Sequence, residues 1–167
     1  MTTLSFSSMP PSIPGSLVLP TPLGVALAIR ADDRAITASD FVRTTRVSSG
    51  RIRDALLREA AAQVKAYFRK RLARFDLPLH MDGTVFQKTV WNFVATLETG
   101  ELISYSDLAR AICAPRAARG VAAAMARSPL DLFIPAHRVV GADGTVRGAS
   151  PRSLRRKLLE FEGIILK

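Results

Sequence analysis

The sequence has very few of the side chains that bind metals or form disulfides. Among its 167 residues there is one cysteine, Cys113, and there are two histidines, His80 and His137, far apart in the sequence. A single cysteine excludes an intrachain disulfide and a cysteine-based metal cluster, and the two histidines form no short metal-binding motif. We therefore expect a protein that needs no metal and no other cofactor, in which Cys113 is a buried small apolar residue.

Long hydrophobic runs are also missing, and acidic side chains are scarce. No run approaches the ~18 apolar residues of a membrane-spanning helix. The stretch from Met1 to Pro22 lacks the basic and apolar regions of a signal peptide. We expect a cytoplasmic monomer without a membrane partner. The 24 basic and 14 acidic side chains give a formal net charge of +10, which favours a polyanionic partner such as nucleic acid.

The first half of the chain alternates short apolar runs with turn-forming residues. After a loose lead-in over residues 1–16, apolar runs occupy residues 17–19, 25–29 and 35–37, separated by proline, glycine and aspartate. Short runs at this spacing predict an antiparallel meander.

Residues 51–72 repeat apolar side chains every four positions, which predicts a helix with one face against the sheet. The repeating residues are Leu56, Ala60, Val64, Phe68 and Leu72. At its end the basic cluster Arg69-Lys70-Arg71 permits two interpretations, a phosphate contact or a solvated helix end whose cations suit the helix dipole. We favour the second.

Residues 75–83 contain a proline and a glycine and are predicted to be a linker. We place the domain boundary near His80, itself an ordinary linker residue. This gives a small sheet-and-helix domain over residues 1–80 and a mainly helical domain over residues 81–167. The expected fold class is therefore mixed α/β (α+β).

The second half has the apolar spacing of several helices. One covers residues 86–97 and buries Trp91, and the last covers residues 154–161. A hairpin-like loop is expected at residues 141–144.

Two short helices lie between them in sequence. Ser104 and Asp107 have the spacing of a capping box, which predicts a helix that ends at Ile112. Cys113 and Ala114 then form a turn.

Pro115 is expected at the first position of the next helix, over residues 116–126. Met125 should face inward in this helix, whereas Arg116 and Arg119 face outward. Two short helices joined by a tight turn are typical of a helix-turn-helix that approaches DNA closely.

The apolar turn at residues 134–140 presents His137 and Arg138 together. The neighbour of His137, where an imidazole would activate a nucleophile, is Ala136. Alanine has no nucleophile to offer.

Five blocks in this half, in this order, resemble the O6-alkylguanine-DNA alkyltransferases, whose active-site segment is Pro-Cys-His-Arg-Val. Ala136 stands where that family has its acceptor cysteine. The blocks are Gly-Thr-Val-Phe-Gln at residues 83–87, Ile-Ser-Tyr-x-x-Leu-Ala at 103–109, Pro-Arg-Ala-Ala-Arg-x-Val at 115–121, Ile-Pro-x-His-Arg-Val-Val at 134–140 and Lys-Leu-Leu-x-x-Glu-Gly at 157–163.

The resemblance implies a recognition helix over residues 116–125 that enters the minor groove of duplex DNA. Arg119 would fill the gap left by a flipped nucleotide, and Tyr105 would drive the base outward. Both also have an ordinary interpretation, Arg119 as a solvated side chain and Tyr105 as a packing residue. The DNA contacts that the resemblance implies are Tyr105, Ser106, Arg116, Ala117, Ala118 and Arg119.

The resemblance also implies a pocket for the flipped base and a proton relay beside it. In the family, Glu162 would orient His137, which acts through water to ionise the cysteine, since the thiolate is the attacking species. The pocket residues implied are Tyr105, Met125, Ala136, Arg138, Val139 and Ser150.

The chain departs from the family pattern at Ala136, at Ser128, where the family has asparagine, and at Ala149, where it has tyrosine. Three departures around one site favour an alkyltransferase-like protein, which binds O6-alkylguanine in duplex DNA without repairing it and flags it for nucleotide excision repair proteins. Rescue by Cys113, by a serine or by water is disfavoured.

Two other hypotheses stay open. One is an alkyltransferase inactivated by a single Cys-to-Ala change at Ala136. The other is a helix-turn-helix transcription regulator with a defined DNA site.

Overall fold

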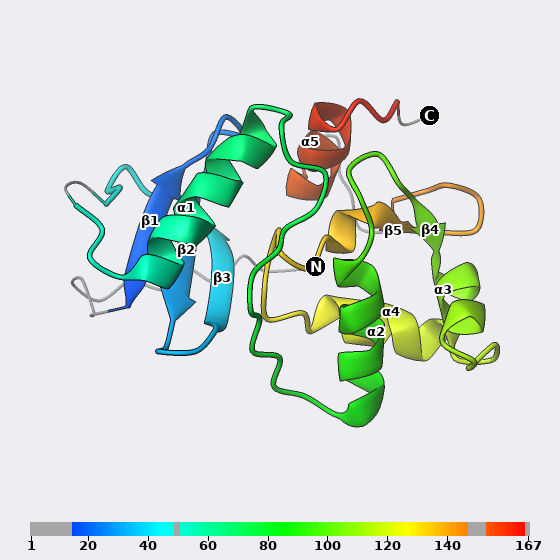
Figure 1. Ribbon diagram of the computed structural model, residues 1–167. Helices are drawn as coiled ribbons and strands as arrows, with labels where there is room; N and C mark the ends of the chain where they lie inside the picture. Colours follow the sequence, from blue (N-terminus) through cyan, green and yellow to red (C-terminus); the bar gives the residue numbers. More distant parts are fainter. Residues whose placement is uncertain (1–14, 49–50, 147–152, 166–167) are drawn as a thin grey trace. The chain divides into compact units, whose positions relative to one another are not determined.

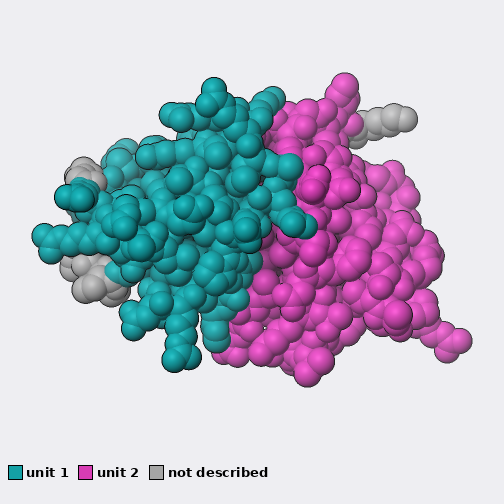
Figure 2. Space-filling model, viewed as in Figure 1, with its two compact units in different colours: residues 1–80, 129–131 teal, residues 81–128, 132–167 magenta. Residues whose placement is uncertain are grey.

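The computed structural model describes residues 15–48, 51–146 and 153–165. The chain forms two compact units. Unit 1 comprises residues 1–80 and 129–131, and unit 2 comprises residues 81–128 and 132–167 (Figure 2). The sequence predicts residues 129–131 in the second domain, whereas the structure places them in unit 1. Three residues that pair with a strand distant in sequence have no pattern of their own that would reveal this. The lead-in expected at residues 1–16 lies almost wholly outside the described residues.

Unit 1 is built on a three-stranded antiparallel sheet of order β1-β2-β3 (Figure 1). The strands are β1 (Ser16–Pro20), β2 (Ala26–Ala31) and β3 (Ile36–Val42). Leu17 faces Ile29 and Leu19 faces Leu27 across the first pair, and all four side chains are buried. Since alternate residues of a strand point to the same face, these pairs make one apolar face, and the predicted meander is confirmed.

Helix α1 (Ala55–Phe68) covers this sheet with a different stripe from the one we predicted (Figure 1). Its buried residues are Leu57, Ala60, Ala61, Val64 and Tyr67. Leu56 and Phe68 are only half-buried. The helix is shorter than residues 51–72, because Asp54 caps it by accepting a hydrogen bond from the Leu57 amide at 2.8 Å.

The C-terminus of α1 closes in a left-handed turn. Lys70 has φ +57°, its amide donates to the Tyr67 carbonyl at 2.9 Å, and the Arg71 amide donates to the Ala66 carbonyl at 2.9 Å. This is the Schellman arrangement, in which glycine is preferred at the left-handed position. A lysine there costs on the order of 1 kcal/mol.

Two separate segments pair with β3. The His80 amide donates to the Ile36 carbonyl at 2.8 Å, so the end of the linker is tied to the strand although the His80 side chain is exposed. The segment 129–131 also pairs there, since the Asp131 amide donates to the Ser39 carbonyl at 3.0 Å and the Ser39 hydroxyl donates to the Asp131 carbonyl at 2.7 Å.

Unit 2 packs its helices around a core that includes Trp91, Leu108, Val121 and Phe133. The predicted core position of Trp91 is confirmed: it is 1% exposed, and its Nε1 donates to the Ala124 carbonyl at 2.9 Å. Its elements are α2 (Val85–Ala95), β4 (Ile103–Ser104), α3 (Tyr105–Ala111), α4 (Ala118–Ala126), η1 (Ala136–Arg138), β5 (Val139–Val140) and α5 (Leu154–Phe161).

The turn between α3 and α4 differs from our prediction in two respects. Cys113 is exposed, not buried, because it occupies the left-handed position of a second Schellman turn, with φ +60°. Helix α4 begins at Ala118, with Ala117 as its N-cap, so Pro115 and Arg116 belong to the turn. Ser104 caps α3 as predicted, accepting from the Asp107 amide at 3.0 Å.

None of the helices in the described ranges is long and apolar enough to cross a membrane.

Candidate functional site

The turn η1 is fixed from both sides. Pro135 precedes it, and the Arg138 amide donates to the Pro135 carbonyl at 2.9 Å. Directly after it, β5 pairs in parallel with β4, with Val139 opposite Ile103. From Leu132 to Val140, every residue except Ala136 is buried, and Ala136 is half-buried. Ala136 is therefore the most accessible residue of this segment.

His137 lies beside Ala136 and is hydrogen-bonded as expected. It is 3% exposed, and its Nε2 lies 2.7 Å from the Glu162 Oε1. Glu162 is the C-cap of α5, and the following Gly163, with φ +87°, closes that helix through a Schellman turn in which the Ile164 amide donates to the Leu159 carbonyl at 2.9 Å. The Glu-Gly pair thus holds the carboxylate in place.

Arg138, one of the predicted pocket residues, is buried and hydrogen-bonded within unit 2. It is 2% exposed, and its Nε and Nη2 donate to Glu162 at 3.1 Å and 2.8 Å. Its Nη1 donates to the Leu97 carbonyl at 2.6 Å, and its Nη2 also reaches the Thr99 hydroxyl at 3.3 Å. The guanidinium therefore ties the chain after α2 to α5. Sequence reasoning missed this role.

Glu162 accepts from one more donor, the Gly100 amide, at 3.3 Å. Gly100 has φ +89°, the left-handed conformation that glycine adopts without strain. We name Glu162, His137, Arg138, Thr99 and Gly100 the Glu162 network. The signal that could have revealed Gly100 was its position just after a predicted helix end.

The charges of the Glu162 network follow from its burial and its hydrogen bonds. Burial raises the pKa of Glu162, but hydrogen bonds from His137 and Arg138 outweigh burial and hold this pKa far below its usual range. Burial lowers the pKa of His137, although its hydrogen bond to Glu162 opposes the shift. An ionised carboxylate only accepts, so the neutral His137 donates from Nε2, and its Nδ1 is left as an acceptor.

The remaining predicted pocket residues are distributed over several elements. Met125 and Val139 are buried, 3% and 0% exposed, and Tyr105 is half-buried at the start of α3. Ser150 and Ala149 lie outside the described residues.

The predicted DNA contacts cluster at the starts of α3 and α4. Ser106 is half-buried in the first turn of α3, as are Ala117 and Ala118 around the start of α4. Arg116 and Arg119 are exposed.

Ser128 follows α4 and has an unusual environment. Its Oγ is buried and has no hydrogen-bond partner within the described part of the chain. A buried hydroxyl without a partner costs on the order of 1 to 3 kcal/mol. The same described part contains no cluster of three or more histidine, cysteine, aspartate or glutamate side chains that could hold a metal ion.

Comparison with known proteins identifies the family. The model described as 6-O-methylguanine DNA methyltransferase, DNA binding domain, matches residues 85–164, and the model for the ribonuclease-like domain of the same enzyme matches residues 17–81.

Two similar relatives are methylated-DNA–protein-cysteine methyltransferases. That of Methanosarcina acetivorans is 42% identical over 107 residues, which cover 64% of this chain and 69% of the relative. The constitutive one of Bacillus subtilis is 34% identical over 155 residues, covering 88% and 94%. Among solved structures, Mycobacterium tuberculosis OGT in complex with DNA matches with a TM-score of 0.73 and 33% identity, over 87% of this chain and 90% of that one. The chain belongs to the O6-alkylguanine-DNA alkyltransferase family.

Proposed function

We propose that the protein binds duplex DNA that contains O6-alkylguanine and leaves the alkyl group in place. The observation that carries this proposal is the half-buried Ala136, which stands next to His137 in a chain that keeps the His137–Glu162 hydrogen bond. In the segment that resembles the family's Pro-Cys-His-Arg-Val, this position would carry the acceptor cysteine. A methyl group cannot be ionised and cannot attack an alkyl carbon.

Cys113 does not offer a substitute acceptor. It is the only cysteine in the sequence and lies exposed in the turn between α3 and α4. Figure 1 shows this turn well removed from η1 within unit 2. A thiol there is not next to the His137 imidazole that would activate it.

DNA binding is assigned to α3 and α4, acting as a helix-turn-helix in the minor groove. Arg119 is exposed in the first turn of α4, and the small Ala117 and Ala118 precede it, so the backbone can approach DNA closely. Gly120 is needed for packing against Phe86 and not for DNA contact, because a Cβ there would lie 3.2 Å from the Phe86 ring. Arg119 then fills the stack vacated by the flipped base, and Tyr105 crowds the neighbouring phosphate.

Lesion preference has two sources in this proposal. Flipping a nucleotide costs a few kcal/mol, and a weakly paired alkylguanine costs less to flip than guanine. Ala136 then leaves the volume of a thiol free for a bulkier alkyl group. A lesion that is bound but not repaired must be passed on, and we propose nucleotide excision repair proteins as the recipients.

The test compares binding with chemistry. Wild-type protein should bind an O6-methylguanine duplex more tightly than the guanine duplex, and a labelled methyl group should stay on the DNA. A Cys113→Ser variant should behave identically. Stoichiometric transfer of label to the protein would overturn the proposal, and its loss in Cys113→Ser would then identify the acceptor.

The Glu162 network also favours a second candidate, an alkyltransferase inactivated at one residue. A neutral His137 hydrogen-bonded to an ionised Glu162 is the arrangement that activates a thiol through water. Restoring the cysteine, in the variant Ala136→Cys, distinguishes the two candidates.

A further inference from the structure

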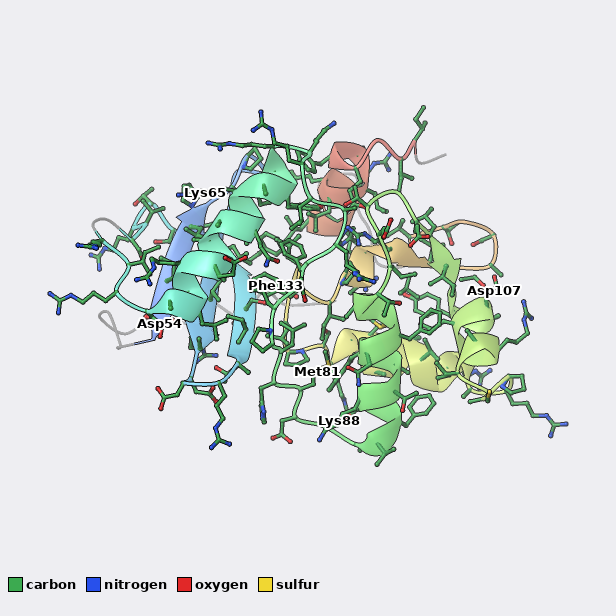
Figure 3. The ribbon with its side chains drawn as sticks, in the orientation of Figure 1. Asp54, Lys65, Met81, Lys88, Asp107 and Phe133 are labelled. Atoms are coloured by element: carbon green, nitrogen blue, oxygen red, sulfur yellow. The ribbon has the colours of Figure 1, made fainter. Side chains whose placement is uncertain are left out.

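The end of α1 carries a group of cations that the proposed lesion site does not use. All are exposed, and no acidic residue occurs between Glu59 and Asp76. Figure 3 shows nitrogen-tipped side chains extending from the end of the helix near the labelled Lys65. We name this group the basic cap, and its members are Lys65, Arg69, Lys70, Arg71 and Arg74.

The three arginines of the basic cap have no role in unit 1 that accounts for their charge. Within the described ranges, Arg69, Arg71 and Arg74 make no ion pair with a carboxylate. Lys65 and Arg69 are four residues apart on adjacent turns, where like charges repel. Folding alone therefore does not favour this cluster.

The helix dipole accounts for only part of the basic cap. Its attraction for cations falls off within the last turn, so it favours Lys65 and Arg69 but not Arg71 and Arg74, which follow the helix. Lys70 occupies a left-handed position, φ +57°, that would suit glycine better. The chain thus carries a lysine there in spite of backbone strain.

The basic cap is held in a fixed geometry. Gln63 on α1 donates from Nε2 to the Asp76 carbonyl and accepts from the Asp76 amide, both at 2.8 Å. The Tyr67 and Phe75 rings pack with their centroids 5.5 Å apart. Together with the Schellman turn, these contacts fold the segment 69–76 back on α1, so its backbone is ordered before any partner binds.

We infer that the basic cap binds the phosphodiester backbone of duplex DNA, without regard to sequence or lesion. Arginine presents a planar fork that matches phosphate oxygens, and three arginines with two lysines suit a polyanion better than a single ion. This surface lies outside residues 85–164, which match the family's DNA-binding domain. The inference rests on the proposed function only for the choice of DNA as the polyanion, and it replaces our sequence-based preference for a merely solvated helix end.

The test uses the full chain and an undamaged duplex of about two helical turns, titrated at several salt concentrations by fluorescence anisotropy. Affinity falls as salt rises, and each phosphate contact adds about 0.9 to the magnitude of the slope of log affinity against log salt, which we call the salt slope. The triple variant Arg69→Gln/Arg71→Gln/Arg74→Gln should reduce that slope by about 2 to 3 and should lower affinity on the order of 10- to 100-fold at low salt. Its preference for O6-methylguanine over guanine should equal that of wild type.

The matched control removes the same charge from exposed positions elsewhere in unit 1, in the variant Arg30→Gln/Arg34→Gln/Arg43→Gln. Its slope should equal that of wild type. Equal losses in both triple variants would mean that only net charge matters, and an unchanged slope in the first would mean that the basic cap does not touch DNA. Either result overturns the inference. A third result would also overturn it. If the Arg69/Arg71/Arg74 variant no longer bound phosphatidylserine vesicles but bound DNA as wild type does, the basic cap would belong to a lipid-binding surface.

Lys70→Gly supplies a variant that should not damage folding. It relieves the left-handed strain, so its Tm should match or exceed that of wild type, whereas its salt slope should fall by about 1. A raised Tm with an unchanged slope would contradict a DNA role for Lys70. If wild-type protein shows no preference for the lesion, the proposed function fails, but the slopes on undamaged DNA still decide the role of the basic cap.

Discussion

Arginine side chains lie in two contrasting environments, one in the buried Glu162 network and the other on the surface of α3 and α4. Arg138 is buried, and its guanidinium donates to Glu162, Leu97 and Thr99. Arg116 and Arg119 are exposed. A buried arginine whose Nε, Nη1 and Nη2 all donate to other groups of the protein serves the structure, whereas exposed arginines add little to stability and remain available for phosphates. The network should therefore control folding and the α3–α4 surface should control recognition.

The largest expected effect comes from breaking the network. Arg138→Met should lower the free energy of unfolding by about 3 to 5 kcal/mol, because it removes one partner of a buried ion pair and leaves the Glu162 carboxylate short of donors. Urea denaturation measures this loss. The control Arg156→Met breaks the surface pair with Glu160 at 3.0 Å and should cost less than about 1 kcal/mol. Equal losses in the two variants would contradict a structural role for Arg138.

Changes on the α3–α4 surface should leave stability alone and reduce recognition. Arg119→Ala should remove the group that holds the vacated stack, and Tyr105→Ala should weaken extrusion of the base. Each should reduce lesion preference by on the order of 1 to 3 kcal/mol, measured by titration with a fluorescent base analogue. Arg69→Ala should leave that preference intact. Wild-type discrimination in both site variants would refute the minor-groove model.

A thiol restored at position 136 tests whether the Glu162 network can still activate a nucleophile. Ala136→Cys places a thiol beside the neutral His137, but Ser128 still replaces the family's asparagine. We expect slow alkyl transfer or none in single-turnover assays, and improvement only with Ser128→Asn added. Rapid transfer by Ala136→Cys alone, unchanged by Ser128→Asn, would favour the enzyme inactivated at one residue.

The smallest expected effect is a pH dependence of stability. The pKa of His137 is lowered in the folded state, so the unfolded chain takes up the proton first as pH falls below about 6.5. The free energy of unfolding should therefore decrease as pH falls from 7 toward 5. His137→Gln should flatten this dependence, and His80→Gln, at an exposed position, should not.

Local patterns predicted much of this structure because they depend on neighbouring residues. The burial of Trp91 follows from apolar spacing along its helix, and the Ser104 cap from a pair three residues apart. The His137–Glu162 contact was predicted only through the family resemblance, since those residues are 25 positions apart.

The failed predictions have distinct physical causes. Cys113 was expected in the core because of its side chain, but the backbone of a left-handed helix end fixes its exposure, and glycine is the usual sign of that conformation. The helix predicted through residue 72 ends at Phe68 for a related reason, because Lys70 adopts the left-handed conformation without being a glycine.

Arg138 was assigned to the pocket through the family resemblance. Its hydrogen bonds to Glu162, Thr99 and Leu97 escaped the sequence analysis because those partners lie 24, 39 and 41 positions away. Neither composition nor periodicity predicts these contacts of Arg138.

The excursion of residues 129–131 into unit 1 makes the two units interdependent in any dissection of the chain. A fragment of residues 81–167 would contain Leu130, which is 0% exposed in the full chain, without the rest of unit 1. Ser39 would then lose its backbone hydrogen bonds to Pro129 and Asp131. A fragment of residues 1–80 would lack the segment that pairs with β3. Recombining the DNA-binding half of the sequence with another N-terminal half therefore requires that the new β3 pair with the same three residues.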